Sequence, residues 1–151
     1  MIKLEHVVLA SPEQMEFIIE GMRNPMNSWE KSDSYAGHEY MGTGNEYFKL
    51  GENDHSLMRR LAKAGTDHRK FMRMLPVYVR ITAPLYWWQM IQLLPSSYNQ
   101  TRNVMINYEV LANIYKSRKD HKLDEWRNFC KWIEELPYSE LITGGTNEKM
   151  A

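Results

Sequence analysis

The sequence predicts a single α+β domain, rich in helix, with a small antiparallel or mixed sheet. Residues 2–9 alternate between apolar and polar side chains and then become wholly apolar. Residues 77–81 are β-branched at alternate positions, and both patterns are typical of strands. Elsewhere apolar residues recur at helical spacing. A chain of 151 residues buries roughly 70% of its unfolded surface, enough for one core. We assign residues 1–143 to this domain and expect residues 144–151 to form a loose tail.

A helix start follows the first strand. Ser11 is expected to cap it, Pro12 fits its first position, and Gln14 completes a capping box. Asn24-Pro25 ends this helix. Its expected inward stripe consists of Met15, Ile18, Ile19 and Met22.

Residues 27–53 show no clear periodicity but hold five aromatic residues. We interpret them as a functional or interface loop with a short helix or hairpin around residues 42–44. A segment of this loop could add a third strand to the sheet formed by residues 2–9 and 77–81. Asp54 is predicted to cap a helix through Ala64, and Asp67 a second one to Leu75. The aromatic residues of the loop are Trp29, Tyr35, Tyr40, Tyr47 and Phe48.

The region from Arg80 to Arg102 organises the rest of the chain. The 77–81 strand is expected to pass into a helix at Thr82 that runs to Leu94, and a polar run then joins it to another helix. That second helix carries two apolar stripes, so it is expected to be either central to the domain or shared with a partner chain. The first stripe consists of Val104, Tyr108, Leu111 and Tyr115, and the second of Ile106, Val110 and Ile114. Of Trp87 and Trp88, at most one can face a ligand, and core packing is the ordinary role for both. A last helix is predicted over residues 123–136.

Net charge is zero, but basic residues gather between residues 56 and 80. A locally basic belt in a neutral chain favours a small anionic ligand or self-association over duplex nucleic acid. The lone Cys130 excludes an intramolecular disulfide and a cysteine-based zinc site. The belt comprises Arg59, Arg60, Lys63, Arg69, Lys70, Arg73 and Arg80.

Three Asp-His pairs occur, and we interpret them as capping aspartates beside exposed histidines rather than a metal site. No apolar segment approaches the roughly 20 residues of a membrane span, and the start of the chain is unlike a signal peptide. A cytoplasmic protein is therefore expected. The pairs are Asp54-His55, Asp67-His68 and Asp120-His121.

The polar run LPSSYNQTR, ending at Arg102, resembles the signature region of flavin-dependent thymidylate synthases, R-H-R-x-x-S-x-N-E-x-S-x-R. The helix pattern from Leu57 to Gly65 is similar too. With the later blocks NYE, RKDHKLDEW and LPYSELI, most of residues 50–143 resemble uncharacterised phage and prophage proteins distantly similar to these enzymes. The resemblance implies a thymidylate-synthase-complementing-protein-like fold and a homotetramer, and it favours an oligomer interface on the helix with two apolar stripes.

The sequence departs from the motif where the enzymes hold flavin. Gln92, Leu93 and Leu94 stand in place of Arg-His-Arg, and leucine can neither hold a phosphate nor move a proton. Ser97 and Arg102 match positions that hold the nucleotide in the family. The nucleotide-binding residues implied by the resemblance and the basic belt are Ser97, Tyr98, Asn99, Gln100, Arg102, Arg69, Arg73 and Arg80.

These observations lead to three expectations for function. The first is a phage-type protein, not catalytic, that binds a nucleotide or related phosphate-bearing small molecule without a cofactor and sequesters a host nucleotide signal in the host cytoplasm. The second is an active flavin-dependent thymidylate synthase-like enzyme of nucleotide metabolism, which would need FAD. The third is an interaction protein that inhibits a host target through its aromatic loop. Catalytic residues stay unassigned, and no metal is expected.

Overall fold

The computed structural model describes residues 2–39, 44–88 and 99–145. This part of the chain contains a three-stranded antiparallel sheet in the order β1 (Lys3–Leu9), β4 (Pro76–Pro84), β5 (Asn99–Asn107). A hairpin of β2 (Tyr35–His38) and β3 (Glu46–Lys49) forms a second sheet. The predicted α+β class with a small antiparallel sheet is therefore confirmed.

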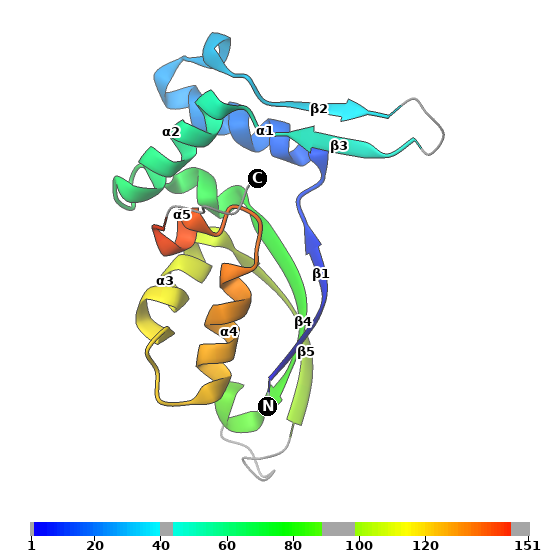
Figure 1. Cartoon of the computed structure of the whole chain (residues 1–151), viewed down its shortest axis with the longest axis vertical. Coiled ribbons are helices and arrows are strands. Elements are labelled where there is room, and N and C mark those ends of the chain that lie inside the picture. Colours follow the sequence, from blue (N-terminus) through cyan, green and yellow to red (C-terminus); the bar gives the residue numbers. More distant parts are fainter. Residues whose placement is uncertain (1, 40–43, 89–98, 146–151) are drawn as a thin grey trace.

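The helices fall into two groups around the long sheet. Helices α3 and α4 lie along one side of it, whereas α1, α2 and the β2–β3 hairpin lie at one end (Figure 1). The α-helices are α1 (Pro12–Arg23), α2 (Glu52–Lys63), α3 (Tyr108–Arg118), α4 (Asp124–Glu134) and α5 (Glu140–Thr143). Short 3-10 helices are η1 (Asn24–Met26), η2 (Trp29–Lys31), η3 (Lys70–Met74) and η4 (Leu85–Trp88).

The predicted start of α1 is confirmed. The Ser11 hydroxyl accepts from the Gln14 N–H (3.2 Å), and the Gln14 side chain accepts from the Ser11 N–H (3.0 Å). This reciprocal pair satisfies N–H groups that a helix end otherwise leaves without partners. The expected inward stripe, Met15, Ile18, Ile19 and Met22, is buried.

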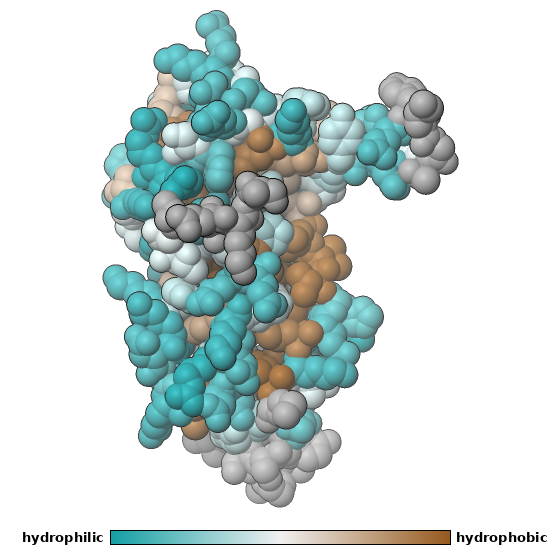
Figure 2. Space-filling view, in the orientation of Figure 1, coloured by the Kyte–Doolittle hydropathy of each residue, from teal (hydrophilic) through white to brown (hydrophobic). Residues whose placement is uncertain are grey.

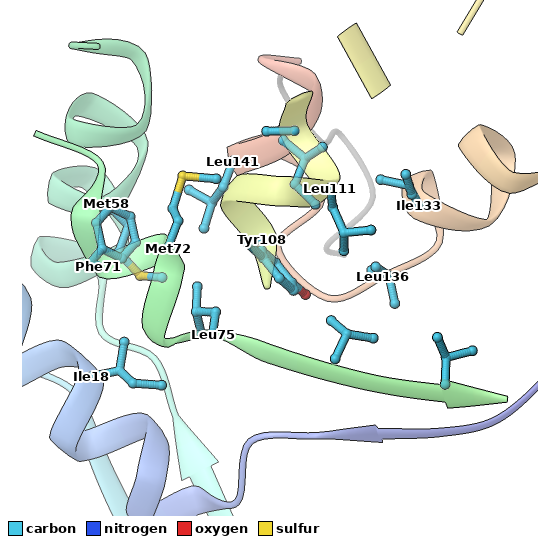
Figure 3. Close-up of a cluster of buried hydrophobic side chains, with 14 of the residues drawn as sticks. Ile18, Met58, Phe71, Met72, Leu75, Tyr108, Leu111, Ile133, Leu136 and Leu141 are labelled. Carbon is cyan, nitrogen blue, oxygen red and sulfur yellow. The ribbon is translucent and has the colours of Figure 1, made fainter. Parts of the chain in front are cut away.

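The core lies between β4 and helices α3 and α4. Alternate β4 side chains, Val77, Val79 and Ile81, face it, and Phe129 and Ile133 of α4 are fully buried. Figure 3 shows side chains of η3, α3 and the α4–α5 region meeting over β4, among them Met72, Leu111 and Leu136. Burying each such side chain contributes roughly 1.5–3 kcal/mol to folding.

The prediction that a helix-to-helix junction precedes Val104 is wrong. Residues 99–107 form strand β5, which pairs with β4 from Pro84↔Asn99 to Pro76↔Asn107. Both expected apolar stripes are therefore part strand and part helix: Val104 and Ile106 lie on β5, and α3 begins at Tyr108. Asn107 is the N-cap of α3, and its side-chain oxygen accepts from the Val110 N–H (3.0 Å). Pairing with β4 satisfies the backbone in place of a helix.

The third strand of the sheet is thus β5 and not a segment of the aromatic loop. That loop instead folds back on itself as the β2–β3 hairpin, one of the two forms expected for it. Residues 82–84, expected to begin a helix, continue β4, and η4 follows. The remainder of that expected helix, from residue 89 through Leu94, lies outside the described residues, as do residues 40–43 and 146–151.

Two further helix predictions need correction. The segment after Asp67 forms only the 3-10 helix η3, whose N-cap is Arg69 and not Asp67. Asp54 does not cap α2, because Gly51 is the N-cap and Asp54 is fully buried inside the helix. The carboxylate of Asp33 supplies the cap by accepting from the N–H groups of Asn53 (2.9 Å) and Asp54 (3.1 Å).

Asp54 joins α2 to α1 through a buried ion pair. Its carboxylate accepts from Arg23 Nε at 2.5 Å, and both side chains are almost fully buried. The hydroxyls of Ser32 (2.8 Å) and Ser34 (2.7 Å) donate to the same carboxylate. Burial acts to raise the pKa of Asp54, but hydrogen bonds from Ser34, Arg23 and Ser32 outweigh it and hold the pKa below its ordinary value.

The sequence suggested that His55 is simply exposed. In the structure its Nε2 lies 2.6 Å from the buried carboxylate of Glu140. Across residues 2–39, 44–88 and 99–145, no group of three or more His, Cys, Asp or Glu side chains is placed to hold a metal ion. None of the helices described there is long and apolar enough to span a bilayer.

Candidate functional site

The end of the long sheet brings two tryptophans and an arginine together. Trp87 on η4 is 7% exposed and packs against Trp126 of α4, with ring centroids 4.8 Å apart, and against Phe129 at 5.6 Å. It therefore belongs to the core, as predicted. Trp88 meets Trp87 edge to face, with centroids 4.8 Å apart, and is only partly buried.

Gln100 and Arg102 lie on the face of β5 that turns toward the helices. One Arg102 Nη donates to Gln100 Oε1 (2.9 Å), and the guanidinium carbon lies 4.9 Å from the centre of the Trp88 ring. A guanidinium over an indole face gains cation–π attraction, which also fixes its plane. We call Trp87, Trp88, Gln100 and Arg102 the Trp–Arg corner.

The Trp–Arg corner is rich in hydrogen-bond donors. The indole Nε1 atoms of both Trp87 and Trp88 are buried, and neither has a hydrogen-bond partner among the residues that the structure describes. An indole nitrogen can only donate, and a guanidinium carries five N–H groups and no acceptor. The corner therefore suits a group with several oxygen acceptors and negative charge.

Tyr86, on the same turn, points outward. Its hydroxyl donates to Glu125 (2.8 Å), and this hydrogen bond raises the pKa of Tyr86 and lowers that of Glu125. The carboxylate is thus engaged with the phenol on the outer side of η4, where Tyr86 is 41% exposed.

Arg80 lies on the opposite face of the sheet from Arg102. The β4 residues Val79 and Ile81 are buried, so Arg80 between them points to the uncovered face. There its Nε donates to Asn103 Oδ1 (3.2 Å), a β5 residue on that same face. Asn99, at the exposed start of β5, shares that orientation by the alternation of the strand. Arg80 is therefore not positioned to act together with Arg102.

Arg69 and Arg73 gather at the other end of the sheet. Both pair with Glu109 at the start of α3, and Arg69 also donates to Asn113 Oδ1 (3.3 Å). The hydrogen bond from Arg73 holds the pKa of Glu109 below its ordinary value. Pro76, which follows η3, pairs with Asn107 of β5. Asn107 lies five residues along β5 from Arg102, a distance of roughly 17 Å at about 3.4 Å per residue.

Of the site residues predicted from sequence, the structure brings Gln100 and Arg102 together at the Trp–Arg corner. It places Arg69 and Arg73 together at the other end of the sheet, both on Glu109. Ser97 and Tyr98 lie outside the described residues. The contact of Trp88 with Arg102 was not predicted, because residues 99–102 were expected at a junction between helices. Reading β5 as an alternating strand would have put Gln100 and Arg102 on the core side.

The four described side chains of the Trp–Arg corner offer an amide, two indoles and a guanidinium, and none of these groups is an acid, base or nucleophile near neutral pH. Comparisons with known proteins add no assignment: no family model matches the chain, and no curated protein or solved structure is significantly similar to it.

Proposed function

We propose that this protein binds a nucleotide or a related phosphate-bearing small molecule at the Trp–Arg corner and does not act on it chemically. One observation carries the proposal: the indole N–H groups of Trp87 and Trp88 are buried with no acceptor among the described residues, and the Arg102 guanidinium lies over the Trp88 ring. In a phage-type protein of the host cytoplasm, such a site would sequester a nucleotide signal. The proposal keeps Gln100 and Arg102 from the sequence-predicted set and adds Trp87 and Trp88.

The energetics favour an oxygen-rich ligand. A buried donor without a partner costs about 1–3 kcal/mol, and a ligand oxygen that reaches it recovers much of that cost. A guanidinium binds phosphate through two parallel N–H bonds, which an ammonium cannot do. The indole held against Arg102 restricts the guanidinium before the ligand arrives, so less conformational entropy is lost on binding.

Thermal melting of the purified chain tests this proposal. The probes are nucleoside monophosphates and triphosphates, inorganic phosphate and FAD, each tested alone. A nucleotide present at one hundred times its Kd should add roughly 2.7 kcal/mol to the free energy of unfolding. Stabilisation by nucleotides without FAD supports the binding protein, whereas flavin absorbance in the purified protein supports the enzyme alternative.

The proposal includes a homo-oligomer, with a tetramer favoured by the resemblance. The supporting observation is the uncovered face of the long sheet, where Val8, Tyr78 and Met105 form one row across β1, β4 and β5. They are 58%, 50% and 58% exposed. Figure 2 shows apolar surface extending below the β2–β3 hairpin, where β1 runs. A patch of this kind on a monomer commonly marks an interaction site.

A further inference from the structure

The outer face of α1 carries three acids around one exposed aromatic ring. Glu13, Glu16, Phe17 and Glu20 follow the i, i+3, i+4, i+7 spacing of a single helix face, turned away from the buried stripe. Phe17 is 66% exposed, the most of any large apolar side chain that the structure describes. Most of the area of this ring is therefore available to a partner.

A groove of about 360 Å³ runs beside these residues. Its other wall is the segment around η2, which contributes Trp29, Ser32 and Ser34. Trp29 is 48% exposed, and its Nε1 donates to Asn24 Oδ1 (2.8 Å), which fixes the indole at the rim. The groove thus has an aromatic side chain on each wall.

The charge of this groove is negative. Arg23 is the one cation among its described lining residues, and it is 3% exposed and bound to Asp54. Glu16 Oε1 accepts from the Ala36 N–H (2.8 Å), which ties β2 to α1. Glu13 and Glu20 have no ion pair in the part of the chain that the structure describes. We call this site the acidic–aromatic groove.

A second hollow of about 340 Å³ lies on the other side of Phe17. Its walls are largely apolar, with Ile18, Met74 and Pro76 beside Phe17 and Glu13. A bound chain that crosses Phe17 would therefore meet an acidic hollow on one side and an apolar hollow on the other. This order selects for a segment that carries both cationic and apolar side chains.

We propose that the acidic–aromatic groove docks a basic segment of another protein. Lysine or arginine side chains pair with Glu13 and Glu20 and lie against the Trp29 ring by cation–π attraction, while a neighbouring apolar side chain packs on Phe17. The three carboxylates repel phosphate, so nucleic acid does not fit the groove. The groove selects cationic groups, whereas the Trp–Arg corner selects anionic ones. A negative result for one site therefore does not count against the other.

The test uses the full chain and short fluorescent peptides, followed by anisotropy. The probe peptide alternates arginine with leucine; the comparison peptides replace arginine by glutamate, or leucine by serine. The Glu13→Gln, Glu20→Gln double variant should weaken probe binding roughly tenfold, and Phe17→Ser should weaken it as well. The matched control is the Glu52→Gln, Glu135→Gln double variant, which removes two exposed charges elsewhere and should bind as the unaltered chain does.

Three results of the peptide assay would overturn the proposal, and two further results would assign the groove to another occupant. The three are no binding of the arginine–leucine peptide, binding that Glu13 and Glu20 do not influence, and equal binding of the peptide that lacks leucine. Spermidine that displaces the peptide completely would mark the groove as a polyamine site instead. Self-association that the double variant abolishes would assign the groove to a second copy of this chain. Melting curves of each variant confirm that it is folded.

Discussion

Asp33 and Asp54 exchange hydrogen bonds across 21 residues of sequence: the Asp33 N–H donates to Asp54 Oδ2 (3.0 Å), and the Asp54 N–H donates to Asp33 Oδ1 (3.1 Å). Each carboxylate thus caps the backbone of the other segment. Because Asp54 also holds Arg23, this exchange fixes α1, the η2 segment and α2 to one another. The acidic–aromatic groove is built from the first two of these.

Replacing Asp54 by asparagine should strongly destabilise the domain. The substitution removes the charge opposite Arg23, which is then a buried cation without compensation, and breaking such a pair costs about 3–5 kcal/mol. Urea unfolding followed by circular dichroism measures the change. Asp67→Asn, at an exposed carboxylate, is the control and should change stability by less than about 0.5 kcal/mol. Equal stability of the two variants would refute the role assigned to Asp54.

Asp54 also makes stability depend on pH. Its folded pKa lies below the unfolded value of about 3.9. A group of this kind contributes stability that is fully present above the unfolded pKa and is lost as pH falls through the folded pKa. Unfolding free energy should therefore fall in acid more steeply for the unaltered chain than for Asp54→Asn. Parallel pH profiles for the two proteins would show that Asp54 titrates alike in both states.

Gly51 is required by close packing rather than by its backbone angles. Its φ of −79° suits any residue, but a Cβ there would overlap the side chain and carbonyl of Asp33. Gly51→Ala should therefore cost roughly 1–3 kcal/mol. The control is Gly21→Ala inside α1, where a Cβ would meet Met74 at an ordinary 3.5 Å and should be neutral or stabilising. Thermal unfolding of both variants measures their stability. A Gly51→Ala variant as stable as the unaltered chain would contradict the close packing of Gly51 against Asp33.

Self-association should respond to the sheet face and not to α3. Tyr78→Glu places a charge at the centre of the exposed Val8–Tyr78–Met105 row, whereas Val110→Glu alters an exposed apolar position on α3. Sedimentation velocity should show that the first variant shifts toward monomer and the second does not. The reverse result would place the oligomer interface on α3, as first expected from the sequence.

The sequence predicted most of what depends on short-range patterns. The Ser11 capping box, the buried stripe of α1 and the alternating 77–81 strand are all local, and each is found in the structure. The wrong predictions concern positions whose structure depends on residues far away in the sequence. Asp54 has the position of a cap in sequence, but Asp33 reaches it from 21 residues away and Arg23 from 31 residues away.

The candidate site was only partly predictable for the same reason. Val104, Tyr108 and Leu111 fit helical spacing, and nothing local reveals that a strand ends between the first two. Pairing with β4 overrides that pattern, and it turns Arg102 toward Trp88 and leaves Arg80 on the other face. The basic belt likewise gave no indication that Glu109 would engage Arg69 and Arg73.

The most direct test of nucleotide binding at the Trp–Arg corner compares two arginines on opposite faces of one sheet. Isothermal titration measures the affinity of the nucleotide that stabilises the unaltered chain most, for Arg102→Ala and for Arg80→Ala. Losing a charge-assisted bidentate contact at Arg102 should weaken binding at least tenfold, since such bonds contribute about 1.5–3 kcal/mol, while Arg80→Ala binds as before. Unchanged affinity in Arg102→Ala, or an equal loss in both variants, would contradict the site.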